Sequence, residues 1–336
     1  MKSWPCTRPA MGLLFACMVF ALGCKSGGST PAKTATSPPF MSAVAGSAPV
    51  PAGQEAPAAD KTGGFDGNRA YEQVAKQVSF GPRPAGSPAL AKLQDYLETE
   101  LKSYGCTVET DSFSADTPAG RLPMKNLLVK IPGEKSGIIM LGTHYDTKRL
   151  DNFVGADDAG SSTGVILEMA RLLCAQKQPG KYAVWMAFFD GEEAVNQAWV
   201  NPDNRYGSRQ MASKLAQSGD LPKIRAFILV DLVGGQNPHF LRDGESTDWL
   251  KSFVWDVAEK LGYGNVFGST PTDFGGDDHY SFTARNVPSV DIMDLDTKND
   301  VPYWHTPQDT LDKISPKTLA IVGYVVLESV KQLQQK

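Results

Sequence analysis

Apolar residues recur along the chain with two spacings, which predict alternating helices and strands. In residues 69–78, Tyr71, Val74 and Val78 have helical spacing, and four leucines of residues 88–105 fall on one helical face. Residues 137–146, "GIIMLGTHYD", form an apolar run of the kind expected of a strand covered on both faces. Further helices are expected at 160–176, 206–217, 248–262 and 315–334, and strands at 106–113, 124–131, 182–190, 224–234 and 287–295. This alternation predicts an α/β fold: a single domain with a mostly parallel central β-sheet flanked by helices.

The start of the chain predicts an export signal. Lys2 and Arg8 flank the beginning of an apolar stretch, "MGLLFACMVFAL", that is too short to span a bilayer comfortably. The stretch ends in "ALGC", which resembles the lipobox of bacterial lipoproteins, although Ala21 stands where leucine is more usual. The resemblance implies that Cys24 is the lipidated first residue of the mature chain. An ordinary cleaved signal peptide that contains a cysteine is the alternative.

The next segment is rich in Ala, Pro, Gly, Ser and Thr and has almost no periodic apolar signal. Such a sequence buries too little apolar surface to offset the entropy lost on ordering. We therefore expect a lipoprotein signal peptide at 1–23, a disordered linker at 24–64 and a catalytic domain at 65–336. The protein would then be exported and anchored to a membrane through Cys24, on its periplasmic or cell-surface side.

Charge and cysteine content narrow the classes of partner. The net charge is −4, and no block of Lys and Arg suggests a surface that follows a phosphate backbone, so we expect no nucleic-acid partner. Beyond the first 24 residues the cysteines are Cys106 and Cys174. They could form one disulfide or remain two buried thiols. With 336 residues, one large domain can bury a substantial core, and we expect a monomer.

Acidic residues and histidines gather at the ends of the predicted strands and in the loops that follow. They are His144, Asp146, Asp157, Asp158, Glu192, Glu193, Asp231, Asp277, Asp278, His279 and His305. In open α/β sheets, ligands bind outside the carboxyl ends of the strands. His, Asp and Glu from well-separated positions are also typical ligands of a catalytic zinc ion. The pattern therefore predicts a metal site at this edge of the sheet.

Each motif taken alone also has a purely structural interpretation. "GADDAG" could be a helix N-terminus at which acids are favoured, and "DDHYSF" could be a solvated turn. A histidine at a strand end, as in "THYD", is often a satisfied structural group, and adjacent glutamates often mark a wet surface. "WHTPQDTLDKIS" could be a loop that enters a helix, with Thr310 or Ser315 as the cap. The ordered occurrence of all these motifs at strand ends favours the metal site.

From about residue 71 to residue 336 the chain resembles the zinc aminopeptidase-type fold group. Within this group it is most similar to the animal-type glutaminyl-peptide cyclotransferases, or glutaminyl cyclases. "THYD", "GADD", the "EE" pair and a late "HT" are shared with the peptidases. "FFDGEEA", Trp199 followed by "YGSRQMA", "DLVGGQNPHF", "DDHYSF" and "WHT" are similar to cyclase motifs.

The resemblance implies a set of roles for individual residues. One zinc ion per chain would be bound by Asp158, Glu193 and His305. Glu192 would transfer protons, with Asp231 and Asp277 as its hydrogen-bonding partners, and Trp199 and Trp304 would wall the substrate pocket. The implied reaction converts the N-terminal glutamine of peptides or proteins to pyroglutamate and releases ammonia. The two adjacent glutamates would thus have different tasks.

Two other functions are consistent with the same residues. His144 and Asp231 stand where the peptidase relatives place ligands of a second metal, so a two-metal zinc aminopeptidase is the first alternative. A catalytically inactive binding lipoprotein is the second, although the intact acids, histidines and tryptophans disfavour it. Cys106 and Cys174 do not flank "THYD" and "GADD" as the usual disulfide of the cyclases does, so no equivalent bridge is expected.

Overall fold

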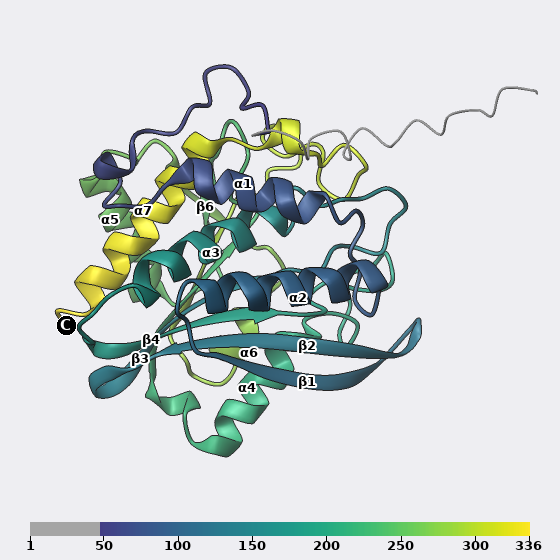
Figure 1. Ribbon diagram of the computed structural model, residues 1–336, viewed down its shortest axis with the longest axis horizontal. Coiled ribbons are helices and arrows are strands. Elements are labelled where there is room, and N and C mark those ends of the chain that lie inside the picture. The colour runs from purple at the N-terminus through teal and green to yellow at the C-terminus, as the bar shows by residue number, and fades with distance from the viewer. Residues whose placement is uncertain (1–47) are drawn as a thin grey trace, which may run out of the picture. The chain divides into compact units, whose positions relative to one another are not determined.

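The structure, a computed structural model, describes residues 48–336, in which helices and strands alternate (Figure 1). The strands are β1 (Val108–Thr117), β2 (Gly120–Ile131), β3 (Gly133–His144), β4 (Gly180–Phe189), β5 (Ile224–Asp231), β6 (Phe240–Asp243), β7 (Phe267–Thr272) and β8 (Ser289–Met293). The helices are α1 (Gly67–Val78), α2 (Pro88–Ser103), α3 (Gly160–Cys174), α4 (Tyr206–Ser218), α5 (Asp248–Lys260), α6 (Tyr280–Thr283) and α7 (Pro316–Leu333). Each element expected from the sequence is present, whereas β6, β7 and α6 were not expected. These three are short, and β7 contains Pro271, so they lack the periodic pattern of the longer elements.

One six-stranded sheet, in the order β1-β2-β4-β3-β5-β8, forms the centre of the fold. Its strands β4, β3, β5 and β8 are parallel to one another, as predicted, whereas β1 pairs antiparallel with β2 and β2 antiparallel with β4. The β1–β2 pair is antiparallel because residues 118–119 can join a hairpin but not a parallel crossover. The expected α/β domain is therefore confirmed, with a mixed sheet.

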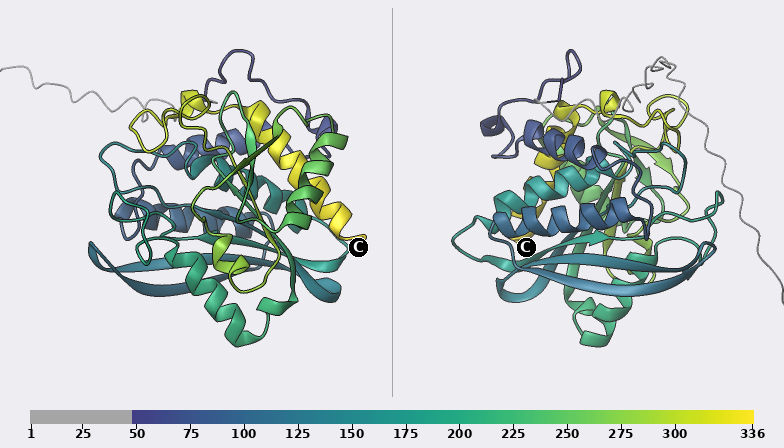
Figure 2. Two further views of the ribbon diagram at one scale, coloured as in Figure 1. Left: turned by 180° about the vertical axis from the view of Figure 1, so that it is seen from behind. Right: turned by 45° about the vertical axis from the view of Figure 1, so that its right-hand side comes forward.

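Helices cover both faces of this sheet (Figures 1 and 2). On one face α1, α2, α3, α5 and α7 pack over strand residues such as Leu141, Val184 and Ile228. On the other face α4 and α6 pack over alternate residues of the same strands, such as Met140 and Trp185. Both faces of the parallel strands are thus buried, which explains why their sequences are apolar runs rather than alternating patterns.

The ordered domain begins before residue 65. The hydroxyl group of Tyr71 donates to the backbone oxygen of Pro49, and Gln54 accepts hydrogen bonds from Ser315 and from the backbone nitrogen of Lys317. Residues 48–64, which the sequence assigns to the linker, therefore lie against α1 and the start of α7. The predicted export signal, Cys24 and the first part of the linker fall outside the described residues. Among residues 48–336, no helix combines the length and apolar character needed to cross a membrane.

A disulfide joins Cys106, just before β1, to Cys174 at the end of α3. The sequence left open whether these cysteines pair, and the structure shows that they do. The two cysteines are 68 residues apart, so the bond closes a loop that contains β1, β2, β3 and α3. Cross-linking a long loop stabilises a fold mainly by restricting the unfolded chain.

Reduction of this disulfide should therefore destabilise the domain by about 2–4 kcal/mol. The measurement is thermal unfolding with and without dithiothreitol. The double variant Cys106→Ala/Cys174→Ala serves as control, because its midpoint should be low and insensitive to the reductant. Equal midpoints for the oxidised and reduced wild-type protein would contradict the stabilising role.

Candidate active site

The parallel strands bring the predicted site residues to one edge of the sheet. His144 ends β3 opposite Phe189 of β4, and Asp231 ends β5 opposite Met293 of β8. Glu192 and Glu193 follow β4, the "GADD" loop precedes α3, and His305 lies between β8 and α7. This edge is the carboxyl end of the parallel strands, where α/β sheets bind their ligands.

A pocket of about 150 Å³ opens at this edge. Its lining contains all eight predicted site residues: Asp158, Glu192, Glu193, Trp199, Asp231, Asp277, Trp304 and His305. A larger cavity of 630 Å³ lies at the opposite end of the strands, where the lining residues are apolar, basic or neutral polar. By volume alone, the larger cavity would be the candidate active site. The smaller pocket is the better candidate because it contains the carboxylates and the histidine that could bind a metal or transfer protons.

Asp158, Glu193 and His305 face one another. Each offers one ligand atom, and these atoms lie within 4.8 Å of one another. Nε2 of His305 is 3.2 Å from Oδ2 of Asp158 and 3.0 Å from Oε1 of Glu193. Burial alone would lower the pKa of His305, but the carboxylates of Glu193 and Asp158 outweigh burial and raise this pKa to about 10. Two oxygens and one imidazole nitrogen in this arrangement fit a zinc ion.

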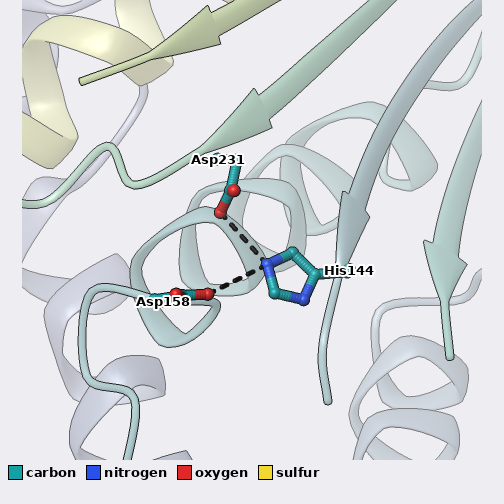
Figure 3. A group of neighbouring side chains, drawn as sticks. All are labelled: His144, Asp158 and Asp231. Atoms are coloured by element: carbon teal, nitrogen blue, oxygen red, sulfur yellow. Dashed lines mark hydrogen bonds and ion pairs between the residues drawn. The ribbon is translucent and has the colours of Figure 1, made fainter. Parts of the chain in front are cut away.

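His144 connects Asp158 to Asp231 on the other side (Figure 3). Nε2 of His144 lies 3.2 Å from Oδ1 of Asp158 and 3.1 Å from Oδ1 of Asp231. Burial would lower the pKa of His144, but the carboxylates of Asp231 and Glu192 raise it well above its usual range. Since Asp158 uses Oδ1 toward His144 and Oδ2 toward His305, it lies between two groups of potential metal ligands.

Glu192 is 5% exposed and lines the pocket beside Glu193. Its backbone nitrogen donates to Oδ1 of Asp146 over 3.0 Å, and its Oε2 lies 3.7 Å from Nδ1 of His144. Burial raises the pKa of Glu192 well above its ordinary value, and the carboxylates of Asp277 and Glu193 add to this effect against the opposing charge of His144. A carboxyl group with a raised pKa can both accept and donate a proton near neutral pH.

Asp231 and Asp277 lie in the pocket, but neither is hydrogen-bonded to Glu192 among the described residues. Oδ1 of Asp231 accepts from the backbone of Leu232 and faces His144, while Oδ1 of Asp277 accepts from the backbone of Asp278. Burial raises the pKa of Asp231 to about 7, with further contributions from Asp158 and Asp277. Asp277 therefore raises the pKa of Glu192 through its charge rather than through a direct hydrogen bond.

The two tryptophans lie on the pocket wall. The ring of Trp304 stacks on His305 with 3.9 Å between ring centroids, and Nε1 of Trp199 donates to the backbone oxygen of Gly276 over 3.2 Å. This last contact holds Trp199 against the backbone of Gly276.

The "GADD" loop is held by residues that the sequence did not single out. A side chain on Gly155 would place its Cβ 1.9 Å from the backbone oxygen of Asp158, so only glycine fits there. The buried guanidinium group of Arg83 donates to the backbone oxygens of Val154 and Gly155. Asp309 accepts from the backbone nitrogens of Asp157 and Asp158 over 2.8 and 3.1 Å. Arg83 and Asp309 contact backbone atoms of the loop, and such contacts do not depend on the residue types in the loop. The sequence therefore did not indicate that these two residues support the site.

Lys148 is a further residue missed at the sequence level. Its ammonium group lies 3.5 Å from Oε2 of Glu193, and its side chain is almost fully buried in the pocket lining. The sequence feature that could have pointed to Lys148 as a pocket residue is its position two residues after "THYD".

Comparison with known proteins agrees with this geometry. Residues 126–330 match peptidase family M28. The chain is 30% identical over 269 residues to the glutaminyl-peptide cyclotransferase-like protein of Bos taurus, in an alignment that covers 70% of this chain and 68% of that protein.

Two crystal structures extend the comparison. The Acidobacteriales bacterium glutaminyl cyclase is 39% identical with a TM-score of 0.76, over 85% of this chain and 99% of that one. A Zn-dependent exopeptidase from Parabacteroides distasonis is 30% identical with a TM-score of 0.70, over 79% of this chain and 97% of that one. The chain therefore belongs to peptidase family M28. Within that family, it falls among the relatives named glutaminyl-peptide cyclotransferases.

The role of Asp309 can be tested through stability. Asp309→Ala would leave two backbone N–H groups without acceptors in a buried place, each costing about 1–3 kcal/mol. We expect the free energy of unfolding, measured by urea titration, to fall by about 2–4 kcal/mol. Asp312→Ala, an exposed change in the same segment, should have an effect of about 0.5 kcal/mol or less. Similar losses in the two variants would show that Asp309 does not hold the loop.

Proposed function

We propose that this protein is a glutaminyl-peptide cyclotransferase that converts N-terminal glutamine to pyroglutamate. The observation that carries the proposal is the convergence of Asp158, Glu193 and His305 beside a buried, separate carboxyl group, Glu192, in one small pocket. This arrangement offers a metal site and a proton carrier at the same place. The named relatives on the same scaffold carry this activity in their names.

The reaction is an intramolecular acyl transfer. The α-amine of the terminal glutamine attacks the carbon of its own side-chain amide, a C–N bond forms in the new ring, and the old amide C–N bond breaks. The proton lost by the α-amine balances the proton gained by the leaving nitrogen, which departs as ammonia. Water is not consumed, so a pocket that excludes it also excludes the competing nucleophile.

We assign one zinc ion per chain to Asp158, Glu193 and His305, because their ligand atoms lie within 4.8 Å of one another and combine carboxylate with imidazole. When bound, zinc supplies a Lewis acid for the amide oxygen. His305 is fixed for this task by the stacked ring of Trp304 and by Phe153, whose ring meets it edge-on at 5.9 Å.

Glu192 is assigned the proton transfer. It accepts the proton of the attacking amine and then donates it to the leaving nitrogen, so one carboxyl group serves both steps. The negative charges of Asp277 and Glu193 near it strengthen its hold on the proton. Trp199 and Trp304 would line the path of the glutamine side chain and keep water out.

A two-metal aminopeptidase is the alternative that a specific observation favours. His144, Asp231 and Asp158 also offer ligand atoms within 4.8 Å of one another, and Asp158 is common to both groups. A Gln-initiated peptide distinguishes the two activities. Ammonia release, with no metal bound between His144 and Asp231, supports the cyclase. Release of free glutamine, with a metal bound there beside the one at Asp158, Glu193 and His305, supports the peptidase.

We also propose that the protein is exported and anchored at Cys24. The motif "ALGC" after an apolar segment supports this location, and so does a disulfide in the domain, since disulfides persist in oxidising compartments. The enzyme would then act on peptides or proteins outside the cytoplasm.

The two adjacent glutamates should respond differently to the same substitution. Glu192→Gln keeps the shape of the side chain but cannot carry a proton, so kcat should fall by about 10²–10⁴-fold while bound zinc and KM change little. Glu193→Gln should instead weaken zinc binding, and added zinc should partly restore its activity. The measurements are zinc content and steady-state constants for both variants. Loss of zinc only in Glu192→Gln would reverse the assignment.

The anchor is tested by Cys24→Ser. We expect the wild-type protein in the membrane fraction and in the detergent phase on partitioning, because acyl chains hold it there. The variant should be soluble or remain uncleaved. Cys17→Ser is the matched control, since it removes a cysteine of the predicted signal segment that does not carry the anchor. Unchanged partitioning of Cys24→Ser would contradict lipidation.

A further inference from the structure

A second group of buried ligating side chains adjoins the pocket. Asp277 lies in the loop before α6, His279 is the residue that precedes α6, and Asp291 is the central residue of β8. His279 and Asp291 are fully buried, and Asp277 is 4% exposed. One ligand atom from each of the three lies within 4.8 Å of the others. The reaction assigned above uses neither His279 nor Asp291.

Most polar atoms of this group have no hydrogen-bonding partner among residues 48–336. Nδ1 of His279, both carboxylate oxygens of Asp291 and Oδ2 of Asp277 are in this state, whereas Nε2 of His279 faces the carboxylate of Asp243. Native proteins rarely leave buried polar atoms unpaired, since each one costs free energy. Several such atoms from three side chains that face one another indicate a shared partner.

The surroundings of His279 are those of a metal-bound histidine. Its Nε2 lies 3.2 Å from Oδ2 of Asp243, and its Nδ1 lies 3.6 Å from Oδ2 of Asp291. A histidine that binds a metal through one nitrogen usually directs its other nitrogen to a carboxylate. Asp243 is held for this role by the hydroxyl group of Ser246, which donates to the same Oδ2 over 2.8 Å.

The spacing also suits a metal. With bonds of roughly 2.0–2.2 Å, two ligand atoms of a tetrahedral zinc ion lie roughly 3.3–3.6 Å apart. The distance between Nδ1 of His279 and Oδ2 of Asp291 is 3.6 Å, which is the upper end of this range. One imidazole with two carboxylates is a donor set that zinc and similar divalent transition-metal ions accept.

The charge balance requires a cation or several protons. Asp243, Asp277 and Asp291 surround one histidine, and Asp278 and Asp231 lie close enough to act on Asp291 through charge. The nearest lysine, Lys251, directs its ammonium group to the backbone oxygen of Asp243 and to the carboxylate of Asp248. No protein cation therefore neutralises the group within the described residues, apart from His279 itself.

We propose that Asp277, His279 and Asp291 form a second, structural zinc site, distinct from the catalytic ligands and from the His144–Asp231 pair. Nδ1 of His279 and one oxygen of each aspartate bind the ion. This cation would tie the start of α6 to β8. It would also neutralise part of the charge on Asp277, which lines the pocket near Glu192. The proposal does not depend on the reaction assigned to the pocket.

Metal analysis of the intact protein, saturated with Zn²⁺ and freed of excess ion, tests the site. The wild-type protein should retain two zinc equivalents per chain and Asp291→Asn one. Asp294→Asn is the matched control, because Asp294 is a buried acid three residues further along that only accepts backbone N–H groups, and this variant should retain two. One equivalent in the wild-type protein, or an unchanged two in Asp291→Asn, would overturn the proposal.

A crystallographic measurement decides the matter without any variant. Anomalous difference maps recorded on either side of the zinc absorption edge should show a peak among Asp277, His279 and Asp291 as well as a peak at Asp158, Glu193 and His305. The proposed site would be refuted by a single peak at Asp158, Glu193 and His305. It would also be refuted if the second peak lay between His144 and Asp231 instead. Turnover is measured separately. A protein that shows both peaks but has no cyclase activity would refute the proposed reaction and still support the zinc site at Asp277, His279 and Asp291.

Discussion

The burial of many carboxylates at one edge of a sheet is the constraint on which the site depends. Asp158, Glu192, Glu193, Asp231 and Asp277 are each at most 6% exposed, and few cations accompany them. In a region of low dielectric constant, neighbouring negative charges must be balanced by protons, cations or N–H groups. Asp158 is balanced by two histidines, whose hydrogen bonds lower its pKa against the effect of burial. Glu192 faces His144 only at 3.7 Å, and burial raises its pKa above the ordinary value. The different pKa shifts of these acids thus follow from how closely each one faces a histidine.

The scaffold meets this constraint through its backbone. The parallel strands end at one level, so loops from β3, β4, β5 and β8 approach each other without long excursions. Arg83 and Asp309 then fix the "GADD" loop by contacts to main-chain atoms on its two sides. Such contacts hold Asp158 in place without using its side-chain oxygens, which remain free to face His144 and His305. Rigid support of this kind is what a catalytic centre requires.

The sequence predicted the elements with strong periodicity and the residues within recognisable motifs. Apolar runs such as that of β3 and the leucine face of α2 are local signals, and so is the "EE" pair after β4. The pairing of Cys106 with Cys174 depends on tertiary distance, which residue types do not encode. Asp309, Asp243 and Asp291 were missed for the same reason, because each acts through partners far away in the chain. Hydrogen bonds between Glu192 and the two aspartates were expected, but Asp231 accepts from the backbone of Leu232 and Asp277 from the backbone of Asp278.

The chain order of the three proposed zinc ligands has a consequence for biosynthesis. Asp158 and Glu193 are made early, whereas His305 lies 112 residues after Glu193 and close to α7, the last helix. A nascent chain that ends before residue 305 has two carboxylates at this place but no third ligand. The metal centre can therefore close only when nearly the whole polypeptide is present. For a chain threaded through a membrane from its N-terminus, this means that metal uptake falls in the compartment where folding is completed, so the ions available there decide which metal the enzyme acquires.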